Sequence, residues 1–123
     1  MKLTLSSRSQ NYIRAYEADE VRVADQIVRT NCVIAPEQIV SDWSARSVDA
    51  LTAADLKCIF DFKPEVVILG TGLRQQFPAP AIRAAFLARE IGFEVMDLGA
   101  ACRTFNVLLS EDRRVVAALL LEM

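Results

Sequence analysis

From Leu51 to its end the sequence alternates between helical patterns and short apolar runs, and this alternation limits the fold more than any other feature. It is typical of parallel strands that are joined by right-handed helical crossovers. A strand whose residues are all apolar is expected to be buried on both faces of its sheet. The pattern therefore predicts an α/β fold with strands at residues 66–69, 93–96 and 115–121.

Local signals place the ends of the helices between these strands. Thr52 can cap the first helix while Asp55 returns a hydrogen bond to it, which makes a capping box, and Pro64 ends this helix. Pro78 and Pro80 suit the entry of the second helix, and Gly92 is placed to end it in the left-handed conformation. The expected apolar residues are Ile82, Phe86, Leu87 and Ile91 in the second helix, and Ala101, Phe105, Leu108 and Leu109 on one face of the third.

The first part of the chain, up to residue 45, has a different sequence pattern. Short β-type runs occur at residues 12–16, 21–23, 27–28, 32–34 and 39–40, separated by acidic or Asn/Pro breaks. We expect hairpins here, although the break at residues 17–20 lacks the Asn-Gly pair of a tight two-residue turn. Because 123 residues is the length of one domain, we expect a single α/β domain over residues 1–123, β-rich over 1–45 and alternating over 51–123.

Composition and charge exclude several classes of protein. With 53% apolar and 24% charged residues, the chain can form a core and is not dominated by disorder. Its net charge of -2, without any basic block, argues against a nucleic-acid partner. The longest apolar run, residues 115–121, is much shorter than the roughly 20 residues of a membrane helix. The N-terminal residues lack the apolar region of a signal peptide. We therefore expect no membrane insertion.

The chain contains no histidine, which removes much catalytic and metal chemistry. Neither Ser-His-Asp nor Cys-His catalysis can be completed within it, nor can a histidine-ligated metal site. Its three cysteines, Cys32, Cys58 and Cys102, are odd in number and lack CxxC spacing, so neither a disulfide framework nor a zinc site is indicated. We expect no metal, no cofactor, no catalytic residues and a reducing, cytoplasmic compartment.

The best candidate for a binding loop follows the strand at residues 66–69. Ligands of open α/β sheets bind outside the carboxyl ends of the strands, and here those ends carry Gly70-Thr71-Gly72, Arg74 and, after the next strand, Asp97. Both loops should open on the same edge of the sheet. Glycines allow close approach to a bound group, and Arg74 could clamp an anion. In the alternative interpretation the two glycines only allow a sharp turn after a buried strand, and Arg74 is either solvated or paired with Asp97.

Three other features also have a functional and a structural interpretation. Cys102 lies in the first turn of a helix, where the helix dipole and Arg103 could favour a reactive thiolate, but a free cysteine is more often a buried apolar group. Asp97 could act as a general base or bind a ribose, but a short acidic side chain before a helix commonly serves as its N-cap. The aromatic residues Trp43, Tyr12 and Tyr16 could anchor an interface, or could be half-buried side chains that cover a sheet.

The order of several motifs resembles a known family. These are residues 68–72, Pro78, residues 92–96 and above all residues 101–111, Ala-Cys-Arg-Thr-Phe-Asn-Val-Leu-Leu-Ser-Glu. Together they look like the small bacterial and archaeal proteins related to mitochondrial complex I assembly factor three, over roughly residues 33–122. The resemblance implies a three-layer β+α/β/α fold with a central mixed sheet, and a protein that acts by binding other proteins. It brings no established catalytic residues.

Two hypotheses follow. In the first, the chain is a non-catalytic protein-binding factor that assists assembly of respiratory complex I or another membrane complex, with its partner surface on the strand-end face around Arg74 and Arg103. In the second, it is a small-molecule or nucleotide-binding enzyme that holds an anion in the Gly-Thr-Gly loop, with Asp97 as the candidate base. The candidate surface for either comprises Gly70, Thr71, Gly72, Arg74, Asp97, Arg103 and Asn106.

Overall fold

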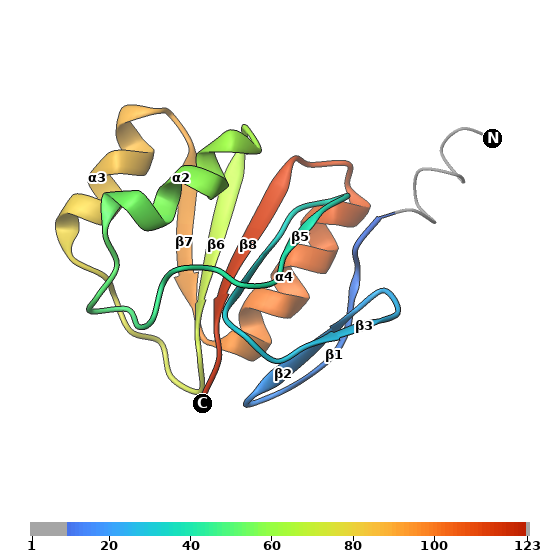
Figure 1. Ribbon diagram of the computed structural model, residues 1–123. Helices are drawn as coiled ribbons and strands as arrows, with labels where there is room; N and C mark the ends of the chain where they lie inside the picture. The colour runs from blue at the N-terminus through green and yellow to red at the C-terminus, as the bar shows by residue number, and fades with distance from the viewer. Residues whose placement is uncertain (1–9, 123) are drawn as a thin grey trace.

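A computed structural model describes residues 10–122 of the chain, so the start of the expected β-rich region lies outside the described residues. Eleven elements follow one another (Figure 1). They are β1 Ile13–Glu17, β2 Glu20–Val23, β3 Gln26–Val28, β4 Cys32–Ile34, β5 Ile39–Val40, α2 Ala53–Asp61, β6 Val66–Thr71, α3 Pro80–Ala88, β7 Gly92–Met96, α4 Leu98–Ser110 and β8 Val115–Leu120.

The central sheet has five strands in the order β5-β4-β8-β6-β7. Strand β6 pairs in parallel with both β7 and β8, whereas β4 is antiparallel to β8, so the sheet is mixed. Helices α2 and α3 cover one face, and α4 together with the small sheet β1-β2-β3 covers the other (Figure 1). The predicted fold class, three layers of β+α/β/α around a mixed sheet, is confirmed.

Alternate residues of the buried strands supply two separate cores. On β6 and β8, Val66, Ile68, Ala117 and Leu119 pack toward α4 and the small sheet, while their sequence neighbours pack toward α2 and α3. This division follows from the two-residue period of a strand, and it explains why residues 66–69 and all of β8 are apolar. All residues of β6 and β8 are buried, and for residues 66–69 this was predicted.

The small sheet is formed by two consecutive hairpins, as predicted. The first has a two-residue turn, because Glu17 pairs with Glu20 across Ala18 and Asp19. The second turn follows Val23, where Ala24 takes the left-handed conformation with φ of 54°. The turns therefore form without the Asn-Gly sequence that usually marks them.

The helix ends agree with the sequence in one case and differ in another. The carboxylate of Asp55 accepts the Thr52 backbone N–H at 2.9 Å, as the predicted capping box requires. The prediction that Gly92 ends α3 in the left-handed conformation is wrong. Glu90 takes that conformation, with φ of 59°, and Gly92 is the first residue of β7. The chain reverses two residues earlier than expected because α3 already ends at Ala88.

Candidate functional site

The loops that follow β6 and β7 meet at one edge of the central sheet, as expected. The Leu98 backbone N–H donates to the Gly72 carbonyl at 2.7 Å, and the Thr71 hydroxyl lies 3.2 Å from the Met96 carbonyl. An open depression of about 410 Å³ lies over this junction, lined by residues of β1, both loops and the start of α4. The described C-terminal end of the chain reaches the same lower edge in Figure 1. We call this region the strand-end face.

Gly70 is buried at the contact between β6 and α4. A Cβ atom at this position would lie 2.9 Å from Leu119 Cδ2 and 3.0 Å from Ala101 Cβ, closer than side chains normally pack. The glycine thus lets α4 approach the sheet. It faces the core rather than the solvent, so it offers no backbone group to a ligand at this edge.

Thr71 folds the loop that follows it. Its buried hydroxyl donates to the Arg74 carbonyl at 2.6 Å and accepts the Gln76 backbone N–H at 3.0 Å. A hydroxyl with a donor and an acceptor already bound has little capacity left for a ligand. Gly72 turns the chain with φ of +80°, a conformation that favours glycine, and a Cβ there would lie 2.5 Å from Glu122 Oε2.

The Gly-Thr-Gly loop at residues 70–72 does not form a phosphate-binding site with the start of a helix. Such a site uses the amides at the start of the next helix, but α3 begins only at Pro80, well beyond the loop. The helix that does begin at this edge, α4, has Asp97 at its N-cap, where the carboxylate accepts the Ala100 backbone N–H at 2.9 Å. Its negative charge occupies the place that an anion would take. The interpretation of Asp97 as a helix cap is confirmed.

Arg74 and Arg103 present positive charge on this face in different ways. Arg74 is exposed, and none of the ion pairs of residues 10–122 joins it to Asp97. Arg103 is held in place, because its Nη1 donates to the Tyr16 hydroxyl at 2.8 Å. The Tyr16 ring lies across Gly99, where a Cβ would be 2.7 Å from the hydroxyl oxygen. An exposed arginine is thus fixed against a half-exposed aromatic ring.

Asn106 lies apart from this face and has a structural role. Its Oδ1 accepts the Ile13 backbone N–H and its Nδ2 donates to the Ile13 carbonyl, both at 2.8 Å. The side chain thereby ties β1 to α4. Of the candidate residues, the structure groups Gly72, Asp97 and Arg103 around the depression, with Gly70 and Thr71 beneath it, Arg74 in the adjoining loop and Asn106 elsewhere.

Sequence reasoning missed how Tyr16 contributes to the strand-end face. It lies 87 residues from Arg103 along the chain, so no local spacing connects the two. Glu122, whose carboxylate lies beside Gly72, was also missed. The only signal for Tyr16 was that it is an aromatic residue in a strand with exposed positions.

The cysteines are protonated apolar groups rather than reactive thiolates. Burial raises the pKa of Cys102 to about 12, although the positive charge of Arg103 acts in the opposite direction. Burial also raises the pKa of Cys32 to about 12, with a further contribution from Cys102. The start of α4 therefore does not activate Cys102, and the interpretation of this residue as a buried apolar group is confirmed.

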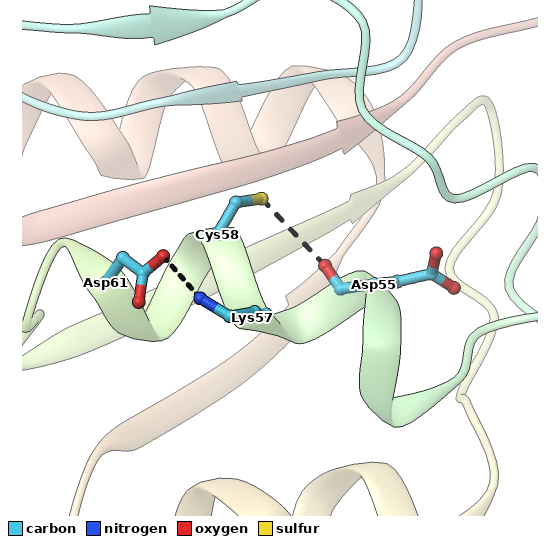
Figure 2. Close-up of polar contacts among 4 residues, drawn as sticks. All are labelled: Asp55, Lys57, Cys58 and Asp61. Carbon is cyan, nitrogen blue, oxygen red and sulfur yellow. Dashed lines mark hydrogen bonds and ion pairs between the residues drawn. The ribbon is translucent and has the colours of Figure 1, made fainter.

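Cys58 differs because it is half-buried on α2. Figure 2 shows its thiol pointing toward the Asp55 carbonyl, at 3.9 Å, beside the ion pair of Lys57 and Asp61 at 3.3 Å. Burial raises the pKa of the Cys58 thiol, and the negative charge of Asp61 raises it further. Over residues 10–122, no group of three or more Cys, Asp or Glu side chains is arranged to hold a metal ion. Nor is any helix in this range long and apolar enough to cross a membrane.

Comparisons with known proteins agree with this architecture. A crystal structure from Bordetella parapertussis is 36% identical and superposes with a TM-score of 0.85, covering 93% of this chain and 98% of that one. An NMR structure from Xanthomonas campestris is 39% identical with a TM-score of 0.81, covering 89% and 83% of the two chains.

A mouse protein named NADH dehydrogenase (ubiquinone) 1 alpha subcomplex assembly factor 3 is 32% identical over 111 residues, which is 89% of this chain and 60% of that protein. The chain thus spans about three fifths of the length of this curated relative. The sequence profile of a family described as protein of unknown function (DUF498/DUF598) matches residues 13–120. Because this match covers most of the chain, the chain belongs to the DUF498/DUF598 family.

Proposed function

We propose that this chain is a non-catalytic protein-binding factor that assists the assembly of respiratory complex I or of another membrane complex. The observation that carries the proposal is the sequence similarity of this chain to proteins named as complex I assembly factors. The three free cysteines support a reducing compartment, and we propose the cytoplasm.

The strand-end face is the proposed partner surface. Arginine and tyrosine are enriched among the residues that dominate binding energies at protein interfaces. Arg103 and Tyr16 are fixed together here at 2.8 Å, so less conformational freedom is lost when a partner binds them. Arg74 adds a second, exposed positive charge in the adjoining loop. The proposed contacts to a partner are therefore made by the Arg74 and Arg103 guanidinium groups and the Tyr16 ring, at the border of a depression that Glu17 and Asp97 also line.

The alternative of a nucleotide- or anion-binding enzyme has no observation in its favour. The Thr71 hydroxyl is already bonded within its own loop. The Asp97 carboxylate caps α4 at the place where an anion would bind. A calorimetric titration with nucleotides and phosphorylated metabolites tests this alternative, and saturable binding that Arg74→Ala abolishes would revive it.

Quantitative affinity capture tests the proposed function. The tagged protein, expressed at its native level, is captured from soluble and membrane fractions and its partners are identified by mass spectrometry. We expect subunits or assembly proteins of a membrane complex, and a roughly 5- to 30-fold loss with Arg103→Ala or Arg74→Ala, the effect of removing about 1 to 2 kcal/mol of binding energy. Arg46→Ala, at an exposed position outside the strand-end face, is the matched control.

Two results would contradict the proposal. If no membrane-complex protein is enriched over an untagged strain, the assembly role fails. If such proteins are captured equally well by Arg103→Ala, Arg74→Ala and Arg46→Ala, the function stands but the strand-end face is not the surface. Tyr16→Phe refines the test, because it keeps the ring and removes the hydrogen bond to Arg103.

A further inference from the structure

Helix α3 is apolar on both of its faces. Ile82 and Phe86 point into the core, but Leu87 is 66% exposed, contrary to its expected place among the core residues of this helix. Phe77, in the segment that leads into α3, is 64% exposed. These two side chains, with Pro78, Pro80, Arg83 and Ala84, line a depression of about 300 Å³ on the outside of the molecule. We call this the α3 outer face.

This composition is unusual for a helix at a protein surface. A surface helix normally has polar and charged residues on its solvent side, yet Arg83 is the single ionisable residue of α3. The neighbouring helix α2 shows the ordinary arrangement, with Lys57 and Asp61 forming an exposed ion pair. Exposed apolar patches of this kind, bordered by polar residues, commonly mark interaction sites.

One guanidinium group is held at the border of the patch. Arg83, which lines the depression, lies 5.2 Å from the centroid of the Phe93 ring and donates to the Phe93 carbonyl at 3.3 Å. None of the ion pairs within residues 10–122 uses Arg83. The border of the patch therefore carries an ordered positive charge that is available to a partner.

Side chains of the chain itself bond the outward carbonyls of the adjacent sheet edge. The Gly92 backbone N–H donates to the Glu65 carbonyl, so the backbone groups of Phe93 and Val95 point away from β6, toward the free edge of β7. The Phe93 carbonyl accepts from Arg83, and the Val95 carbonyl accepts from Gln75 Nε2 at 2.8 Å. An added strand would have to compete with these two bonds, which favours binding on the helix face over extension of the sheet.

We propose that the α3 outer face binds an amphipathic helix of a partner protein that seats an apolar side chain between Phe77 and Leu87 and places an Asp or Glu residue against Arg83. The proposal rests on the protein-binding function proposed above and adds a second surface to it. A hollow between two exposed apolar groups suits an inserted side chain, whereas a lipid surface would require a protruding one. A two-fold copy of this chain would bring the two Arg83 side chains toward one another, which disfavours self-association.

A displayed library of random peptides, selected against the purified full chain, tests this inference. We expect enriched sequences with apolar residues at helical spacing and acidic residues beside them. Their affinity should fall at least about tenfold with Leu87→Glu, which places a charge in the apolar contact. Val107→Glu is the matched control, because Val107 is also an apolar helix residue, 54% exposed, and lies on α4. Arg83→Glu should shift the preference toward basic peptides.

Several outcomes would overturn the inference. These are a selection without enrichment, peptides whose binding survives Leu87→Glu, and enriched sequences without acidic residues. Sedimentation velocity tests the alternative of a second copy, which would appear as a dimer that Leu87→Glu abolishes. Co-sedimentation with vesicles containing phosphatidylglycerol tests a membrane surface. These measurements use purified protein and variants of α3, whereas the test of the proposed function uses affinity capture with variants of Arg74 and Arg103. Either proposal can therefore fail while the other stands.

Discussion

The replacement Asn106→Ala separates a structural role of this residue from a role in partner binding. The side chain makes two hydrogen bonds of 2.8 Å to the backbone of Ile13, and both are partly buried. A hydrogen bond contributes about 0.5 to 1.5 kcal/mol net, so the loss of both lowers the free energy of unfolding by roughly 1 to 3 kcal/mol. We expect about 2 kcal/mol, because water can reach the Ile13 groups and replace part of what is lost.

Urea denaturation and amide hydrogen exchange measure this effect. With a denaturant slope of about 1 to 3 kcal/mol per molar urea for a small domain, the unfolding midpoint should fall by roughly 1 M. The Ile13 amide should exchange faster than in the wild type, because its acceptor has been removed. The control is Ser110→Ala on the exposed side of the same helix, which should change stability by less than about 0.5 kcal/mol.

The reasoning would be refuted by an Asn106→Ala variant that is as stable as Ser110→Ala and keeps a protected Ile13 amide. In that case the two bonds do not hold β1 on α4 in solution, and the Asn106 amide is available to a partner. A loss of captured partners in the affinity experiment, without any loss of stability, would support the same conclusion.

Three further predictions follow from single sites. Gly70→Ala should destabilise the protein by about 1 to 3 kcal/mol in thermal unfolding, since the added methyl would meet two neighbours at 2.9 and 3.0 Å; an unchanged melting temperature would show that α4 can shift freely. Cys32 and Cys102 should resist an aqueous thiol reagent until the protein unfolds, and rapid labelling of both at pH 8 would contradict this. Because their pKa values are raised from 9.0 to about 12, the contribution of these two thiols to stability should be constant below pH 9 and decline above it. Burial alone would raise the pKa of Asp55, but hydrogen bonds, first from Ser44, hold this pKa below 3.8. The contribution of Asp55 to stability is therefore present above that pH and lost in acid. Asp55→Asn should flatten this part of the acid denaturation curve, and an unaltered curve would exclude the contribution.

Neither the exposure of Leu87 on the α3 outer face nor the orientation of Arg103 on the strand-end face could be predicted from local sequence patterns. Leu87 was expected in the core because it continues the apolar pattern of its helix, but the core side is already occupied by Ile82 and Phe86. Arg103, on α4, was identified as a candidate from its motif, yet the residue that orients it, Tyr16, lies on β1 of the small sheet. In both cases the side chain's role depends on what packs beside it.

Local chemistry by itself determined the starts of two helices and the burial of one strand. Asp55 and Asp97 were predicted in capping positions, and both carboxylates accept the backbone N–H groups of a helix start. Residues 66–69 were predicted to be buried on both faces, and they are. These features depend on residues a few positions apart, so the sequence around each of them contains the information.

The tertiary structure decided the strand order and the composition of the candidate surfaces. The last strand, β8, lies between β4 and β6, and it brings Glu122 beside Gly72. Asn106 was a candidate for binding until the chain placed Ile13 against its amide. Which distant segments become neighbours depends on burying apolar surface over the whole chain at once, because the period of a strand fixes which residues share a face but not which strand lies beside it.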